Sequence, residues 1–276
     1  MMIRSGRRSP LWTVILGSAV MAFGLDRLPA SAQSIISTPP DDVTLGLEWK
    51  KPFFPGEGGP ASWSSTLETD LLFRWSPNIF VKAFVPLAFA GADFVDGTSF
   101  YVGNVGATFI FGPPGAPSAF LGLTIPSATN VAGPDLAVLV GALPTEDEPE
   151  LWAEDVLSVR GGIIPTLQLS ERARVGVRVG ASLVAPDDIG DLWIYARGAP
   201  WVSAIVGAAE LRGDLVTSYF VNSEEGFAEQ FRMYLDARAS LSDVPGRPGV
   251  FFRLPLDEEG QDAVDFSAGV SARIGL

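Results

Sequence analysis

The sequence predicts an all-β fold, a single closed antiparallel transmembrane β-barrel of about 12 strands. Three observations lead to this prediction. Apolar and polar residues alternate with a period of two along most of the chain, the mean hydropathy is positive, and no segment beyond the N-terminal region is typical of a membrane-spanning helix. Without spanning helices, an apolar chain can face lipid only through strands of a closed barrel. The alternative is a soluble β-sandwich or barrel with an apolar core.

The N-terminal region is typical of a signal peptide. It has a basic start, an apolar stretch over residues 11–25 and a small-residue cleavage site at residues 30–32. An uncleaved anchor helix is the alternative, but the apolar stretch is short for a membrane span. We therefore expect two parts, a signal peptide at residues 1–32 and one barrel domain at residues 33–276.

Charge and composition exclude several classes of function. Removing the four arginines and one aspartate of the signal peptide changes 19 basic and 32 acidic residues to 15 and 31, a net charge of −16. So acidic a chain is not expected to bind nucleic acid. The sequence contains no cysteine and no histidine, which excludes thiol chemistry, Ser-His catalysis and His-ligated metal sites. We expect no catalytic residue, no cofactor and no bound metal.

Two acidic features leave alternatives open. Carboxylate pairs such as Glu68 with Asp70 could serve acid–base chemistry, but such pairs are far more often solvated. The cluster "TEDEPELWAED" at residues 145–155 could bind calcium, but it lacks the spacing of a defined calcium loop. We interpret the cluster as a solvated acidic loop and the protein as a non-enzyme.

Twelve segments have the pattern of strands. They are residues 43–49, 65–75, 79–87, 101–111, 119–125, 156–169, 174–184, 192–198, 205–220, 228–240, 250–256 and 265–276. Every second connector is short, such as "SPN", "SERA" and "APWVS", and the others include longer and more acidic segments. Bacterial outer-membrane barrels have this asymmetry, with short periplasmic turns and long external loops. Twelve strands would place both termini at the short-turn end.

The last strand alternates up to the final residue, Leu276. A closed barrel needs this pattern, because its last strand must pair with its first. The strand also resembles the C-terminal signal through which outer-membrane barrels meet the barrel-assembly machinery, although Leu276 stands where an aromatic residue is usual. We therefore expect the bacterial outer membrane as the location, and its lipid and the assembly machinery as partners.

One face of the predicted strands is apolar and the other is charged. Leu211, Leu215, Phe231, Leu235 and Val270 are expected to face lipid. The candidates for the lumen face are Arg74, Lys82, Arg160, Arg174, Arg178, Arg197, Arg212, Arg232, Arg238, Arg273, Glu68, Asp70, Glu210, Asp214 and Asp236. Ten basic against five acidic residues predict a preference for anions, unless the charges pair and simply fill the lumen.

Aromatic residues near strand ends are expected in interfacial girdles: Trp49, Trp63, Trp75, Tyr101, Trp193, Trp201 and Tyr219.

The segments "VKAFVPLAF", "YVGNVGATFIFG", "AFLGLTIPSAT" and "FFRLPL" carry a family resemblance. On them the chain resembles the outer-membrane transporters of the phenol meta-pathway type. The resemblance implies passive transport of small solutes, aromatic or organic-acid compounds among them, and supplies no binding residues. The alternative is a barrel that is plugged by its own salt bridges and serves a structural or surface role.

Overall fold

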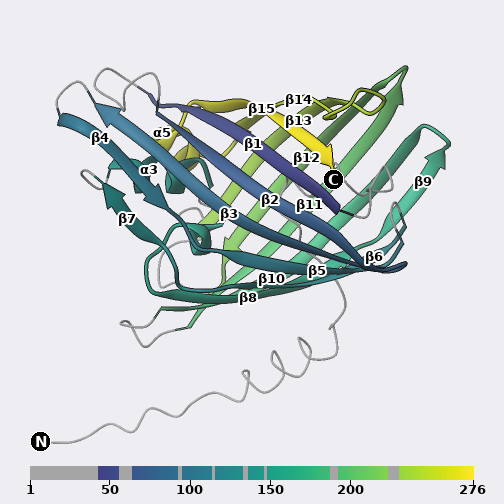
Figure 1. Ribbon diagram of the computed structural model, residues 1–276. Helices are drawn as coiled ribbons and strands as arrows, with labels where there is room; N and C mark the ends of the chain where they lie inside the picture. The colour runs from purple at the N-terminus through teal and green to yellow at the C-terminus, as the bar shows by residue number, and fades with distance from the viewer. Residues whose placement is uncertain are drawn as a thin grey trace, which may run out of the picture.

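The computed structural model describes residues 43–55, 64–92, 95–113, 116–132, 136–145, 148–186, 192–222 and 230–276. The predicted signal peptide and Trp63 lie outside these residues. The chain forms one barrel of tilted strands, with short helical segments toward one end (Figure 1).

The elements follow the alternating pattern of the sequence. The strands are β1 (Val43–Phe53), β2 (Ser65–Ser76), β3 (Ile79–Ala92), β4 (Val95–Val102), β5 (Gly106–Phe111), β6 (Ser118–Thr124), β7 (Thr129–Ala132), β8 (Val156–Ile164), β9 (Thr166–Ser170), β10 (Ala173–Pro186), β11 (Trp193–Val206), β12 (Ala209–Phe220), β13 (Phe231–Leu241), β14 (Gly249–Pro255) and β15 (Phe266–Gly275). The helical segments are α3 (Leu136–Ala142), η1 (Leu143–Thr145), η2 (Pro149–Leu151) and α5 (Glu258–Ala263). None of these described helices is long and apolar enough to cross a membrane.

The strands close into a barrel. In the described residues, fifteen strand segments form one sheet, in which β1 pairs with β15 and β2 pairs with β3. Three barrel strands are each interrupted once: β4 and β5 both pair with β3, β8 and β9 both pair with β10, and β7 continues the line of β6. The prediction of a closed antiparallel barrel with 12 strands is confirmed.

The chain termini meet where the barrel closes. β1 and β15 pair over ten positions, from Thr44 opposite Gly275 to Phe53 opposite Phe266. Beyond the strand, the Leu276 amide donates to the Val43 carbonyl at 2.9 Å. The final residue of the sequence is therefore used to close the wall.

One predicted turn is wrong. The segment "APWVS" lies inside β11, and the chain turns instead at Gly207, whose φ of +63° suits glycine. Pro200 suggested a break, but a proline is tolerated where the strand ladder is interrupted. The β11–β12 pairing skips Ala199 and Pro200 and then resumes.

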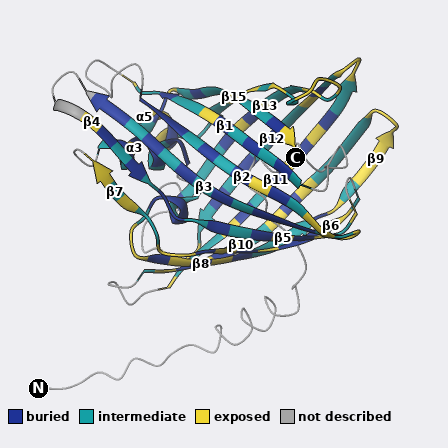
Figure 2. Cartoon of the chain, viewed as in Figure 1, coloured by how far each residue is buried: buried dark blue, intermediate teal, exposed yellow. Residues whose placement is uncertain are grey.

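The outer face of the wall is apolar. Leu211, Leu235 and Val270 are 44%, 41% and 51% exposed, and large aliphatic side chains of β6, β8, β10, β11 and β14 share this exposure. Figure 2 shows exposed residues along most of β9, and in β8 exposed residues alternate with buried ones. An apolar surface of this extent would be unfavourable in water. We therefore infer that it faces lipid.

Candidate transport path

The inner face of the barrel is charged. Residues directly opposite each other on neighbouring strands point to the same side of a sheet, so a face can be followed around the wall. One row runs from Arg174 through Ser203, Arg212 and Arg238 to Phe251. The register places all fifteen lumen candidates on this face: Arg74, Lys82, Arg160, Arg174, Arg178, Arg197, Arg212, Arg232, Arg238, Arg273, Glu68, Asp70, Glu210, Asp214 and Asp236.

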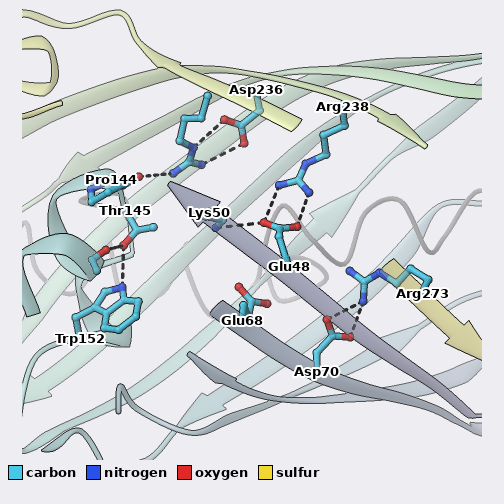
Figure 3. A network of polar contacts seen from close by, with 12 residues as sticks. Glu48, Lys50, Glu68, Asp70, Pro144, Thr145, Trp152, Asp236, Arg238 and Arg273 are labelled. Carbon is cyan, nitrogen blue, oxygen red and sulfur yellow. Dashed lines mark hydrogen bonds and ion pairs between the residues drawn. The ribbon is translucent and has the colours of Figure 1, made fainter. Parts of the chain in front are cut away.

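An ion-pair network joins the strands where the barrel closes (Figure 3). The Arg273 Nη1 atom donates to both carboxylate oxygens of Asp70 at 2.7 Å, and Lys82 Nζ lies 2.8 Å from Glu68 Oε1. Gly46 of β1 lies between Asp70 and Arg273 in the register. A Cβ atom at Gly46 would overlap both side chains, so the glycine provides the space for this pair.

Like charges stand opposite each other on β12 and β13. Arg212 faces Arg238, and Asp214 faces Asp236. Such pairs destabilise a sheet unless each charge finds an opposite partner. Arg212 donates two hydrogen bonds of 2.9 Å to Asp214 on its own strand, while Arg238 reaches Glu48 of β1 at 2.7 Å. The network therefore links strands that are not neighbours in the wall.

The segment between β7 and β8 folds into the barrel. We call residues 136–152 the plug, of which 136–145 and 148–152 are described. Ala137, Val140 and Trp152 are at most 3% exposed, and they pack with Phe84 and Tyr101 of the wall in one apolar cluster. This packing gives one side of the lumen a dry core.

A buried ion pair holds the far end of the plug. Glu150 of η2 is fully buried, and it accepts hydrogen bonds of 2.7 Å and 2.6 Å from the Arg197 guanidinium on β11. Burial raises the pKa of Glu150, but the charges of Arg197 and Arg160 together with the hydrogen bonds that Glu150 accepts hold the pKa below its ordinary value. Glu148 lies 3.6 Å from Arg160 of β8. The prediction of a solvated acidic loop is therefore wrong for Glu150.

Further polar contacts fix the rest of the plug. The Asn104 amide, in the break between β4 and β5, donates to the Glu150 and Ala153 carbonyls at 2.9 Å and 2.6 Å. Trp152 donates its indole proton to Thr145 at 2.9 Å. Because Asn104 is itself fully buried, the break in the wall serves to attach the plug.

Arg253 of β14 connects the plug to the opposite wall. It binds Asp236 at 2.8 Å and donates to the Pro144 carbonyl at 3.1 Å (Figure 3). Sequence reasoning missed Arg253, Glu48 and Glu150. Alternation around Glu48 and Arg253 could have revealed the first two, but nothing in the sequence pattern reveals that Glu150 turns inward.

Two of the predicted girdle aromatics lie inside the barrel. Tyr101 is 2% exposed beside Trp152, and Trp201 is 8% exposed beneath Arg212. Trp49 and Trp75 are 40% and 70% exposed on the outside. The prediction of a girdle position is therefore wrong for both residues. Tyr101 packs inward near the end of β4, and Trp201 lies within β11 because the turn expected there is absent.

Comparison with known proteins identifies relatives by fold alone. No sequence-defined family and no curated protein matches the chain. An outer membrane channel from Pseudomonas putida F1 is similar with a TM-score of 0.57 at 14% identity, over 90% of this chain and 99% of the channel. The NanC porin matches with a TM-score of 0.51 at 8% identity, over 85% and 100%, and LpxR from Salmonella typhimurium with 0.51 at 9%, over 84% and 100%. The chain therefore has the β-barrel fold of these outer-membrane proteins.

The described carboxylates Glu68 and Asp70 of the inner face take part in ion pairs. The chain contains no histidine or cysteine, and the described residues hold no group of three acidic side chains that could bind a metal. The carboxylates Glu68 and Asp70 bind Lys82 and Arg273. These two ion pairs place positive and negative side chains next to each other on the inner face.

Proposed function

We propose that the protein is a passive channel for small solutes, with aromatic and organic-acid compounds among them. The observation that carries the proposal is the partial exposure of charged side chains on the inner face. Lys50, Arg238 and Glu148 keep 18%, 10% and 13% of their side-chain surface open. A barrel filled only by its own side chains would bury such groups completely.

The alternative is a barrel closed by the plug, with a structural or surface role. The bidentate Glu150–Arg197 pair and the apolar cluster around Trp152 support this alternative. The two functions differ in one property, the passage of solute through the lumen.

Single-channel recording in planar bilayers tests the proposal. We expect stable conductance steps from the purified protein, and uptake of small solutes into liposomes that contain it. A barrel that folds in bilayers and passes neither ions nor solute would favour the closed alternative. Outer-membrane lipid and solute are the proposed partners, and the barrel-assembly machinery would recognise β15. We also propose residues 1–32 as a cleaved signal peptide.

A further inference from the structure

The ion pairs of the inner face do not expose both partners equally. Five described pairs expose the cation more: 8–18% of its side chain is open, against 0–3% for the carboxylate. The pairs are Lys50–Glu48, Arg212–Asp214, Arg238–Glu48, Arg253–Asp236 and Arg273–Asp70. Their cations lie on β1 and β12 to β15, which are consecutive in the wall. We call these five cations the cationic strip.

Two described ion pairs outside the strip show the reverse order. Glu68 of β2 is 10% exposed where its partner Lys82 is fully buried, and Glu148 of the plug is 13% exposed where Arg160 is fully buried. Because β2 is the neighbour of β1 and Glu68 lies opposite Glu48, one of these carboxylates stands at the edge of the strip. A solute that contacts the strip itself meets mainly cations, and the low-dielectric wall around them strengthens their field.

Aromatic rings lie against the cationic strip. The Arg212 guanidinium lies 4.3 Å from the Trp201 ring centre, and Arg253 lies 4.7 Å from that of Tyr234. Arg238 lies over the Phe251 ring at 5.0 Å. Such contacts hold a cation in place without neutralising it. A planar guanidinium also has a second face, on which another ring can stack.

We propose that the cationic strip binds small organic carboxylates, and aromatic acids in particular. The carboxylate would accept hydrogen bonds from the guanidinium groups, and the aromatic body would stack on them. This inference names the solute class of the proposed channel, so it rests on the proposed function for transport. Binding itself does not require conduction.

The test compares benzoate with neutral benzyl alcohol on the full barrel. Calorimetric titration of the purified protein should give saturable binding of benzoate, at least about tenfold tighter than of benzyl alcohol, as expected for one charge-assisted hydrogen bond. Reversal potentials across a sodium benzoate gradient should show preference for the anion.

Two variants remove parts of the strip. Lys50→Gln removes the most exposed cation and leaves the Arg238–Glu48 pair intact. The combined change of Arg238→Gln and Glu48→Gln removes a guanidinium together with its buried carboxylate. Each should weaken benzoate binding roughly tenfold. If the double variant fails to fold, as judged by heat-modifiable migration on gels, Lys50→Gln alone tests the proposal.

Arg172→Gln is the matched control, because it removes an exposed cation in the turn between β9 and β10, away from the strip. It should leave benzoate binding unchanged. An equal loss with Arg172→Gln, or no saturable benzoate binding in a conducting barrel, would refute binding at the strip without refuting the channel. Benzoate binding by a barrel that never conducts would support carboxylate binding at the cationic strip and refute the proposed channel function.

Discussion

The plug side of the lumen and the cationic strip solve the same structural problem differently. Both must accommodate charged or polar groups inside a membrane protein. On the plug side, Phe84, Tyr101 and Trp152 form a dry cluster, and Glu150 and Arg197 are fully buried within their pair. Along the strip, each pair keeps its cation partly open to the lumen.

The two kinds of ion pair therefore differ in what they can do. A fully buried pair such as Glu150–Arg197 fixes one segment against another, because either partner alone would be a buried, uncompensated charge. A pair with one exposed member can still interact with a solute. The four predictions below test this division, beginning with the largest expected effect.

Glu150→Ala should release the plug. It removes the carboxylate that Arg197 binds, and breaking a buried pair in this way costs about 3–5 kcal/mol. Because the strands of the wall pair with one another around the whole barrel, we expect a folded barrel with raised single-channel conductance and with protease cleavage in residues 136–152. Glu259→Ala, an exposed carboxylate of α5, is the control and should change neither. Unchanged conductance in Glu150→Ala would mean that the plug does not control the path.

Leu235→Arg should destabilise the barrel by about 2–4 kcal/mol if the site lies near the bilayer midplane, because an arginine there would face lipid. Ser240→Arg, on the inner face of the same strand, should cost much less. Unfolding titrations in lipid vesicles measure both. Equal losses would show that the outer and inner faces have been assigned wrongly.

Gly46→Ala should cost about 1–3 kcal/mol, the usual range for overpacking a filled interior. Its Cβ would overlap the Asp70–Arg273 pair. The control is Gly213→Ala, whose Cβ meets only Val202 at 3.9 Å and should change stability by less than about 0.5 kcal/mol. The same unfolding titration compares the two. If Gly46→Ala is harmless, the pair at the strip can move aside.

Acid should release the plug only at low pH. At ordinary pH values we therefore expect the smallest effect of the four predictions. Because the pKa of Glu150 is lowered in the folded protein, its contribution is fully present above its ordinary pKa of 4.5. The contribution is lost as the pH falls through the lowered folded pKa. We expect conductance to stay constant from pH 7 to about pH 5 and to rise below that range. Glu150→Ala should lack this acid-induced rise, and a wild-type rise near pH 6 would contradict the assignment.

The sequence predicted the wall well and the interior contacts poorly. Alternation predicted twelve strands and the last strand, because each strand has only two faces and lipid requires one of them to be apolar. The lengths of the connectors predicted the short-turn end. The error at Pro200 came from treating proline as a turn signal where the ladder is merely interrupted. The errors at Tyr101 and Trp201 came from judging aromatic residues by their distance from strand ends.

The sequence by itself determined the closed barrel, its outer apolar face and its charged inner face, since these follow from a period of two that each strand carries locally. Only the tertiary structure decided that residues 136–152 fold inward and that Glu150 meets Arg197. It also decided which member of each ion pair is open to the lumen. These features depend on contacts between residues such as Glu48 and Arg238, 190 positions apart. No local pattern encodes such a contact, because it exists only after the wall has closed.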